Sequence, residues 1–258
     1  MNRLKQAFAD KRPTIGLWQA LANPYTAEIC AGAGYDWLMF DGEHAPNTLQ
    51  TLLAQLQAVA AYPVEAVVRP AANAPVLIKQ LLDMGFRSLL VPMIDTAEQA
   101  KQLVAATRFP PRGIRGVASA TSRASGFGAD AAYLADAHHH LCVIPQIESR
   151  TALDEIEAIA SIEGIDALFI GPGDLAGSLG HLGDPGHADV QAAIADAFRR
   201  IASAGKPAGI FARTAEQARA AFAAGASFVS VGTDVGLLGA GARERARHAR
   251  PDGAAGRA

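Results

Sequence analysis

A junction between helix and strand recurs along this chain. The segments AGAGYDWLMF, DMGFRSLLVP and AAGASFVSVG, which begin at Ala31, Asp83 and Ala223, each contain a helix end, a glycine and a short apolar run. A glycine at this point lets the backbone leave the helix in a left-handed conformation before the strand begins. Short strand-like runs alternate with Ala- and Leu-rich helical patterns throughout, which is typical of βα units in a parallel sheet.

The alternation predicts eight βα units and a single (β/α)8 barrel over residues 1–238. A doubly wound sheet also alternates in this way, but eight units in 258 residues match the usual size of the barrel. Half of the residues are apolar, enough for one large core. The predicted strands are Thr14–Gln19, Trp37–Asp41, Glu65–Arg69, Ser88–Pro92, Leu141–Glu148, Asp166–Gly171, Ala208–Arg213 and Ser227–Gly232.

Two segments lie outside the repeat. Residues 108–140 form a long excursion between the fourth helix and the fifth strand, with Arg115 and Arg123 in roles that the sequence leaves open. Loops of this length are usually functional or disordered, and we favour function. Residues 239–258 are rich in Ala, Arg and Gly; we expect the end after Pro251 to be disordered and the tail to carry no chemistry.

The composition excludes several classes of protein. The 23 basic and 25 acidic residues nearly balance, so we expect no attraction to nucleic acid or to anionic membranes. Cys30 and Cys142 form neither a disulfide framework nor a metal cluster, and are expected to be buried small hydrophobes. The sequence lacks a signal-type apolar region and any membrane-spanning run, which predicts a cytoplasmic protein. Chemistry on a small molecule is the best remaining expectation.

In such barrels the chemistry lies at the C-terminal ends of the strands. The stretch Asp41–His44 follows the second predicted strand and could by itself be an ordinary polar turn. On this rim, however, it joins other groups that a packed core would not choose, so we predict that His44 is functional. The predicted rim residues are Trp18, Gln19, Asp41, Glu43, His44, Arg69, Gln146, Glu148, Asp174 and Asp234.

Glu148 and Asp174 follow the apolar strands of adjacent units, where their carboxylates can converge. Two carboxylates side by side repel, so either one is protonated or a cation lies between them. Hard oxygen ligands favour Mg²⁺ or Mn²⁺, with water or substrate completing the coordination. Either acid alone could simply cap a helix N-terminus. The pair together predicts a metal site.

Arg69 ends the strand VEAVVRP and points a permanent cation toward the same rim. Its guanidinium can hold a carboxylate or an enolate oxygen; the alternative is a salt bridge to Glu148 or Asp41. None of the five lysines falls at the C-terminal end of a predicted strand, so a Schiff base has no nucleophile there. Carbonyl chemistry at this rim therefore requires the metal as Lewis acid. The metal would polarise a ketone, so that the adjacent carbon can carry negative charge as an enolate.

Several motifs in order resemble the 4-hydroxy-2-oxoheptanedioate aldolase (HpcH/HpaI) family of class II, pyruvate-dependent aldolases, over about Gly16 to Leu238. They are GLW at Gly16, FDGEHAPN at Phe40, VVRP at Val67, PPRGIRG at Pro110, PQIES at Pro145 and FIGPGDLAGSLG at Phe169. The resemblance implies a (β/α)8 barrel and reversible cleavage of 4-hydroxy-2-oxo acids to pyruvate, or a close analogue, plus an aldehyde. It also implies a divalent metal (Mg²⁺ or Mn²⁺, with Co²⁺ a further option) and a trimer-based hexamer.

The resemblance further implies roles for individual residues. Glu148 and Asp174 would bind the metal, Arg69 would stabilise the enolate, and His44 would act as acid and base. Trp18, Gln146, Gly173 and Asp174 are the expected substrate-binding residues. Two departures bear on the aldehyde: family members often carry Ser or Ala where this chain has Gly173, and the segment Phe211–Thr214 differs from the commoner apolar-acidic version.

A base such as His44 needs its second ring nitrogen held, usually by a carboxylate. Asp41 and Glu43 are close in sequence, but Asp83 is a further candidate. It ends the third helix, on the bottom face of its own barrel, and can meet a His44 only across a subunit interface. Because the resembling family is oligomeric, we favour Asp83.

Two rival functions remain open from the sequence. One is a metal-dependent lyase of a CoA-linked malate-type substrate, although the sequence contains no recognisable adenine or pyrophosphate motif. The other is a metabolite-binding barrel without catalysis, which has no reason to keep His44 beside the paired acids.

Overall fold

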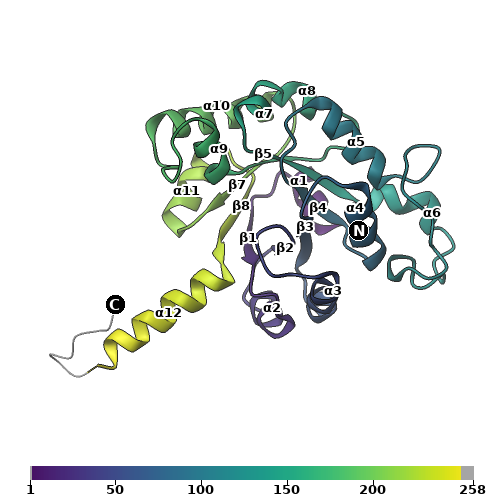
Figure 1. The fold of residues 1–258 in the computed structure, drawn as a ribbon, viewed down its shortest axis with the longest axis horizontal. Helices are drawn as coiled ribbons and strands as arrows, with labels where there is room; N and C mark the ends of the chain where they lie inside the picture. Colours follow the sequence, from purple (N-terminus) through teal and green to yellow (C-terminus); the bar gives the residue numbers. More distant parts are fainter. Residues whose placement is uncertain (1, 251–258) are drawn as a thin grey trace.

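The computed structural model of the protein describes residues 2–250 and forms a closed barrel of eight parallel strands (Figure 1). Each strand pairs with its neighbours in sequence, and β1 pairs with β8 to close the sheet. The predicted (β/α)8 barrel is therefore confirmed. The strands are β1 Thr14–Gln19, β2 Trp37–Asp41, β3 Glu65–Arg69, β4 Ser88–Val91, β5 Cys142–Ile147, β6 Leu168–Ile170, β7 Ala208–Ala212 and β8 Phe228–Thr233.

The first three strands have the predicted limits, and the others differ from them by a few residues at an end. The helix-to-strand glycines behave as expected, since Gly34, Gly85 and Gly225 have φ angles of 93°, 103° and 108°. Side chains rarely adopt this conformation, so glycine at these positions sets the point where each strand begins. The part of the tail after Pro251 lies outside the described residues.

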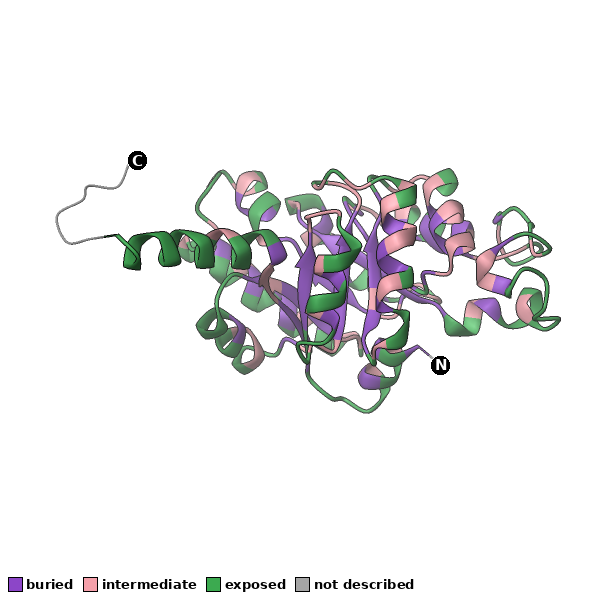
Figure 2. Cartoon of the chain, turned by 90° about the horizontal axis from the view of Figure 1, so that it is seen from below, coloured by how far each residue is buried: buried purple, intermediate pink, exposed green. Residues whose placement is uncertain are grey.

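Helices surround most of the outer side of the sheet. Their bounds are α1 Arg3–Ala9, α2 Pro24–Ala31, α3 Leu49–Ala58, η1 Val59–Ala61, α4 Pro75–Met84, α5 Ala97–Thr107, η2 Arg123–Ser125, α6 Tyr133–Asp136, η3 Ala137–His140, α7 Arg150–Asp154, α8 Ile156–Ala160, α9 Pro172–Ser178, α10 Ala188–Ser203, α11 Ala215–Ala223 and α12 Asp234–His248. Figure 2 shows the buried strands within a layer of helices whose outward faces are exposed.

Apolar side chains fill the barrel interior, so it is a packed core below the rim. Trp37, Phe169 and Phe228 lie there with Cys142, which is buried, whereas Cys30 on α2 is only partly buried. The ring of Trp37 occupies the space beside Gly16, where a Cβ would lie 2.1 Å from the indole. Helix α1 closes the bottom, with its Phe8 ring 4.9 Å from that of Phe228. The barrel interior is therefore closed at this end.

The excursion between α5 and β5 is held against the end of α4. Arg115 is buried and donates to Asp83 at 2.7 Å and to the Tyr133 hydroxyl at 2.9 Å. Arg123 donates to the Met84 carbonyl at 2.9 Å. Arg115 and Arg123 thus fasten the segment to the bottom half of the barrel.

Helix α12 follows β8 but points away from the barrel (Figure 1). The predicted limit of the barrel at residue 238 falls inside this helix. Val235, Leu237 and Leu238 on its first turns are exposed. None of the helices within residues 2–250 combines the length and apolar character needed to cross a membrane.

Candidate active site

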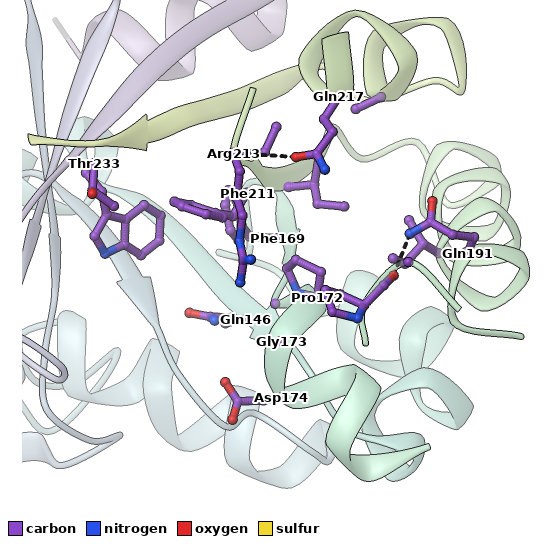
Figure 3. Close-up of a pocket in the computed structure, with 18 of the residues that line it drawn as sticks. Gln146, Phe169, Pro172, Gly173, Asp174, Gln191, Phe211, Arg213, Gln217 and Thr233 are labelled. Atoms are coloured by element: carbon purple, nitrogen blue, oxygen red, sulfur yellow. Dashed lines mark hydrogen bonds between the residues drawn. The ribbon is translucent and has the colours of Figure 1, made fainter. Parts of the chain in front are cut away.

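A cavity of about 850 Å³ opens at the C-terminal ends of the strands (Figure 3). Six of the ten predicted rim residues line it: Trp18, Asp41, His44, Arg69, Gln146 and Asp174. Gly173, an expected substrate-binding residue, lines it as well. Glu148 is not part of the lining, because its side chain is buried at the end of β5. Asp234 has a structural role, accepting hydrogen bonds from the Ala20 and Leu21 amides at 2.8 and 3.1 Å. Gln19 is fully buried.

Arg69 is held in place by two acids. Asp41 and Arg69 are register partners on β2 and β3, and the guanidinium forks onto the Asp41 carboxylate with distances of 3.0 and 2.7 Å. A further guanidinium nitrogen lies 2.9 Å from Glu43. These contacts leave N–H groups of the guanidinium available to a ligand in the cavity. The sequence analysis gave a salt bridge to Asp41 as an alternative role for Arg69. This salt bridge is present, and it orients the guanidinium at the rim.

Trp18 completes this arrangement. Its indole N–H donates to Asp41 at 3.0 Å, and its ring lies 5.0 Å from the Arg69 guanidinium. Burial by itself raises the pKa of Asp41, but the hydrogen bonds and charge of Arg69 outweigh burial, and the pKa lies below its usual value. Asp41 is therefore an anion that stays paired with Arg69 at neutral pH, which makes it a poor candidate for orienting His44.

His44 lies at the edge of the cavity with two thirds of its side chain exposed. Its backbone N–H donates to Asp41 at 3.2 Å, which fixes the start of the turn. The ring Nε2 is 3.8 Å from a Glu43 oxygen, too far for a hydrogen bond. Within residues 2–250 of one chain, no carboxylate is hydrogen-bonded to this imidazole.

Glu148 is an acid with no cation beside it among the described residues. Its carboxylate accepts hydrogen bonds from the Met93 amide at 2.8 Å and from the Gln146 side chain. Burial raises the pKa of Glu148 to about 7, and the like charges of Asp174 and Glu43 add to this. Asp174 lies in the first turn of α9, exposed to the cavity, and Figure 3 shows it facing the same open space as Gln146.

These residues fit a divalent cation. The Gln146 Oε1 atom is buried and has no hydrogen-bond partner in the described part of the chain. At Gly171 a Cβ would lie 2.4 Å from a Glu148 oxygen and 2.7 Å from the Gln146 amide nitrogen, so the space around both groups requires glycine. Two carboxylates and an amide oxygen are the hard donors that Mg²⁺ and Mn²⁺ prefer. A cation at Glu148 and Asp174 would offset the repulsion by Asp174, which adds to the effect of burial on the Glu148 pKa.

Of the other predicted site residues, Gly173 lines the cavity and Asp83 does not. At Gly173 a Cβ would meet nothing within 4 Å, so the missing side chain leaves open space in the cavity wall. Asp83 lies at the end of α4, paired with Arg115, and does not line the cavity of its own chain. No lysine lines the cavity either, as predicted.

The outer wall of the cavity includes residues to which the sequence analysis gave no role, although it noted the segment Phe211–Thr214 as a departure that bears on the aldehyde. Phe169 and Phe211 face Trp18, and Arg213 reaches into the cavity from the end of β7 (Figure 3). Arg213 has no carboxylate within salt-bridge distance among residues 2–250. The rule that strand ends carry the chemistry could have found it, because the seventh predicted strand ends at Arg213.

Comparison with known proteins agrees with this geometry. A family model described as HpcH/HpaI aldolase/citrate lyase matches residues 14–240. A hydroxypyruvate/pyruvate aldolase of Deinococcus radiodurans is 58% identical over 94% of this chain and 87% of its own. A 4-hydroxy-2-oxo-heptane-1,7-dioate aldolase of Salmonella dublin is 52% identical over 93% and 92%. A crystal structure of an HpcH/HpaI aldolase/citrate lyase family protein from Burkholderia cenocepacia superposes with a TM-score of 0.94, at 44% identity, over 97% of this chain and all of the other.

Proposed function

Because the chain belongs to the HpcH/HpaI aldolase/citrate lyase family, we propose that it catalyses the reversible aldol cleavage of 4-hydroxy-2-oxo acids. The products are pyruvate, or a close 2-oxo acid such as hydroxypyruvate, and an aldehyde. The observation that carries this proposal is the position of Arg69, oriented by Asp41 at the same cavity as Asp174, with Glu148 buried beneath and no lysine in the wall.

The metal would be held by Glu148 and Asp174, with Mg²⁺ or Mn²⁺ preferred and Co²⁺ a further option. When bound, it would act as a Lewis acid toward the 2-oxo group of the substrate. Glu148 contributes a carboxylate fixed by the Met93 amide, so its orientation is set before the ligand arrives. The side-chain amide of Gln146 also donates a hydrogen bond to the Glu148 carboxylate, and its own oxygen stays free for a ligand in the cavity.

The chain's own residues would then carry the cleavage. His44 takes the proton from the 4-hydroxyl group, and the bond between C3 and C4 breaks as the aldehyde forms. The enolate that remains is then protonated at C3, which gives pyruvate. The free N–H groups of Arg69 stabilise the negative charge that develops on the 2-oxo oxygen. They need no reorientation, because Asp41 and Glu43 already hold the guanidinium in place. Trp18 and Phe169 shield one side of this site from water.

The aldehyde would occupy the outer part of the cavity. Open space at Gly173 and the unpaired cation of Arg213 are the two features there in which this chain departs from the commoner family pattern. A guanidinium in this position favours an aldehyde that carries a carboxylate or other anionic group.

The function is tested by incubating the purified protein with Mg²⁺ and a 4-hydroxy-2-oxo acid and coupling released pyruvate to a dehydrogenase. We expect cleavage, and in the reverse direction carbon–carbon bond formation from pyruvate or hydroxypyruvate with a panel of aldehydes. A protein that cleaves a malyl-CoA-type thioester but no 4-hydroxy-2-oxo acid would be the rival lyase. Tight 2-oxo acid binding with no turnover of either would indicate a metabolite-binding barrel.

We further propose that the protein assembles as a trimer-based hexamer in the cytoplasm and that Asp83 of the partner subunit orients His44. Within one chain no carboxylate holds the His44 imidazole, and Asp83 has a partly exposed carboxylate that Arg115 fixes on one side only. The exposed apolar residues at the start of α12 support an assembly. Light scattering on the purified protein tests the oligomeric state.

The Asp83→Asn variant should lose activity while keeping its metal. Since this change also leaves Arg115 with a weaker partner, stability has to be measured alongside. Mixing His44→Ala with Asp83→Asn subunits decides the matter, because a hybrid interface would restore one complete pair and part of the activity. Full activity of Asp83→Asn alone, or no recovery on mixing folded subunits, would return the role to Glu43 or Asp41.

A further inference from the structure

Two histidines and an aspartate converge on the loop between α9 and α10, outside the proposed active site. His187 is the N-cap of α10, Asp189 lies in its first turn, and His181 follows α9. Each of the three residues offers one ligand atom, and these atoms all lie within 4.8 Å of one another. Within residues 2–250 this is the one group of three or more His, Cys, Asp or Glu residues with that property. The two imidazoles are stacked, with centroids 3.6 Å apart and planes 15° from parallel.

The spacing of the donor atoms is close to what one metal ion would impose. Zinc binds imidazole nitrogen and carboxylate oxygen at about 2.0–2.2 Å, which places neighbouring ligand atoms of a tetrahedral site about 3.4 Å apart. His181 Nε2 lies 3.4 Å from Asp189 Oδ2, and His187 Nδ1 lies 3.8 Å from the same oxygen. A nitrogen lone pair lies in the plane of its ring, so one of the two stacked imidazoles has to rotate out of the stack before both can bind the same ion.

The backbone that carries these ligands is held in place without an ion. The His181 amide donates to the Ala176 carbonyl at 2.7 Å, and the His187 amide donates to the Asp184 carbonyl at 3.1 Å. Gln191 on α10 donates to the Pro185 carbonyl at 2.8 Å (Figure 3). A loop already fixed at several points loses little conformational freedom when a ligand binds.

We propose that His181, His187 and Asp189 form a second divalent-metal site, separate from Glu148 and Asp174 and of different selectivity. Two imidazoles with one carboxylate suit Zn²⁺, Co²⁺ or Ni²⁺, whereas Mg²⁺ prefers all-oxygen sites. Three protein ligands leave a coordination position for water on this partly exposed loop. Because Pro185 and Gly186 between the ligands line the cavity, an ion here fixes the outer wall of the active site.

Besides the rotation of one ring, binding has a second local cost. The His187 Nδ1 atom now accepts a hydrogen bond from the Asp189 amide at 3.2 Å, as the cap of α10. The ion takes over this lone pair, and the amide turns to water, as first-turn amides of helices commonly do.

The test is the Zn²⁺ stoichiometry of untagged, metal-free protein, measured by calorimetric titration and by metal analysis after dialysis. Wild-type protein should bind one more Zn²⁺ per chain than His181→Ala, and excess Mg²⁺ should not displace it. The Glu148→Gln/Asp174→Asn double variant should keep one Zn²⁺ per chain, and adding His181→Ala should remove it. Co²⁺ in the double variant should give the intense visible absorption of a tetrahedral site.

His138→Ala is the matched control. His138 and His139 also form a stacked pair, with centroids 3.9 Å apart, but their neighbour is Arg112 in place of a carboxylate. This variant should bind Zn²⁺ as wild type does. Asp189→Asn keeps the His187 cap and should weaken Zn²⁺ binding by about tenfold or more, in line with the loss of an anionic ligand. Equal Zn²⁺ binding by wild type, His181→Ala and Asp189→Asn would overturn the proposal.

Discussion

Replacing Arg69 with alanine should lower kcat by about 10²-fold or more, with a smaller change in KM. This is the range for removing one preorganised donor that meets charge developing in the transition state. Arg69 is suited to that role because Asp41, Glu43 and Trp18 fix its guanidinium before substrate binds. Steady-state kinetics with a 4-hydroxy-2-oxo acid measure the effect. Arg69→Lys should recover only part of it, since an ammonium cannot reproduce the fork onto Asp41.

A structural explanation for that loss can be excluded by design. Arg69→Ala leaves Asp41 as a buried, unpaired acid, which would destabilise the barrel mouth. The Arg69→Ala/Asp41→Asn double variant removes the unpaired charge. It should recover thermal stability but not activity. If the double variant regains kcat, or if Arg69→Ala raises KM alone, Arg69 is a plain carboxylate clamp and its role toward the enolate oxygen is wrong.

Removing the divalent metal should abolish turnover. Chelation is expected to bring cleavage to background, and Mg²⁺ or Mn²⁺ should restore it. Borohydride added with pyruvate should leave the protein mass unchanged, because no lysine lines the cavity to form an imine. A reduced pyruvyl adduct on lysine, or full activity in excess chelator, would contradict the metal-dependent mechanism.

The same prediction has a readout that does not depend on catalysis. A cation between Glu148 and Asp174 relieves the repulsion between the buried carboxylate of Glu148 and the exposed carboxylate of Asp174. Because the ion binds only the folded protein, Mg²⁺ or Mn²⁺ should raise the Tm of the wild type. Glu148→Gln should lose this Tm response together with activity. Glu163→Gln, which changes a fully solvated acid at the bottom of the barrel, should keep both and serves as the control.

Much of the fold follows from local sequence. The glycine between helix and strand in several units, the apolar runs and the spacing of eight βα units predict the barrel, and the first three strands have the predicted ends. Closure of a parallel barrel then places every strand's C-terminal end on one rim. For this reason the sequence places His44, Arg69, Gln146 and Asp174 on one rim although they are far apart in the chain, and all four line the cavity.

Side-chain partners at the rim depended on the tertiary structure. The register that pairs Asp41 with Arg69 across β2 and β3 sets the orientation of the guanidinium, and the sequence alone left Glu148 equally possible as its partner. The raised pKa of Glu148 likewise comes from burial and from charges that belong to other βα units. The orientation of Arg69 and the pKa of Glu148 both depend on distances of a few ångströms between residues from different βα units. Local sequence patterns do not encode these distances.

The sequence by itself determined the barrel, the rim that bears the chemistry and the types of residue on it, because these depend on short-range periodicity and helix capping. Only the tertiary structure decided how far each carboxylate is buried, that Arg213 completes the cavity wall, and that His181, His187 and Asp189 meet on one loop. The reason is that burial and convergence are properties of packed neighbours, fixed when loops fold back on the closed sheet.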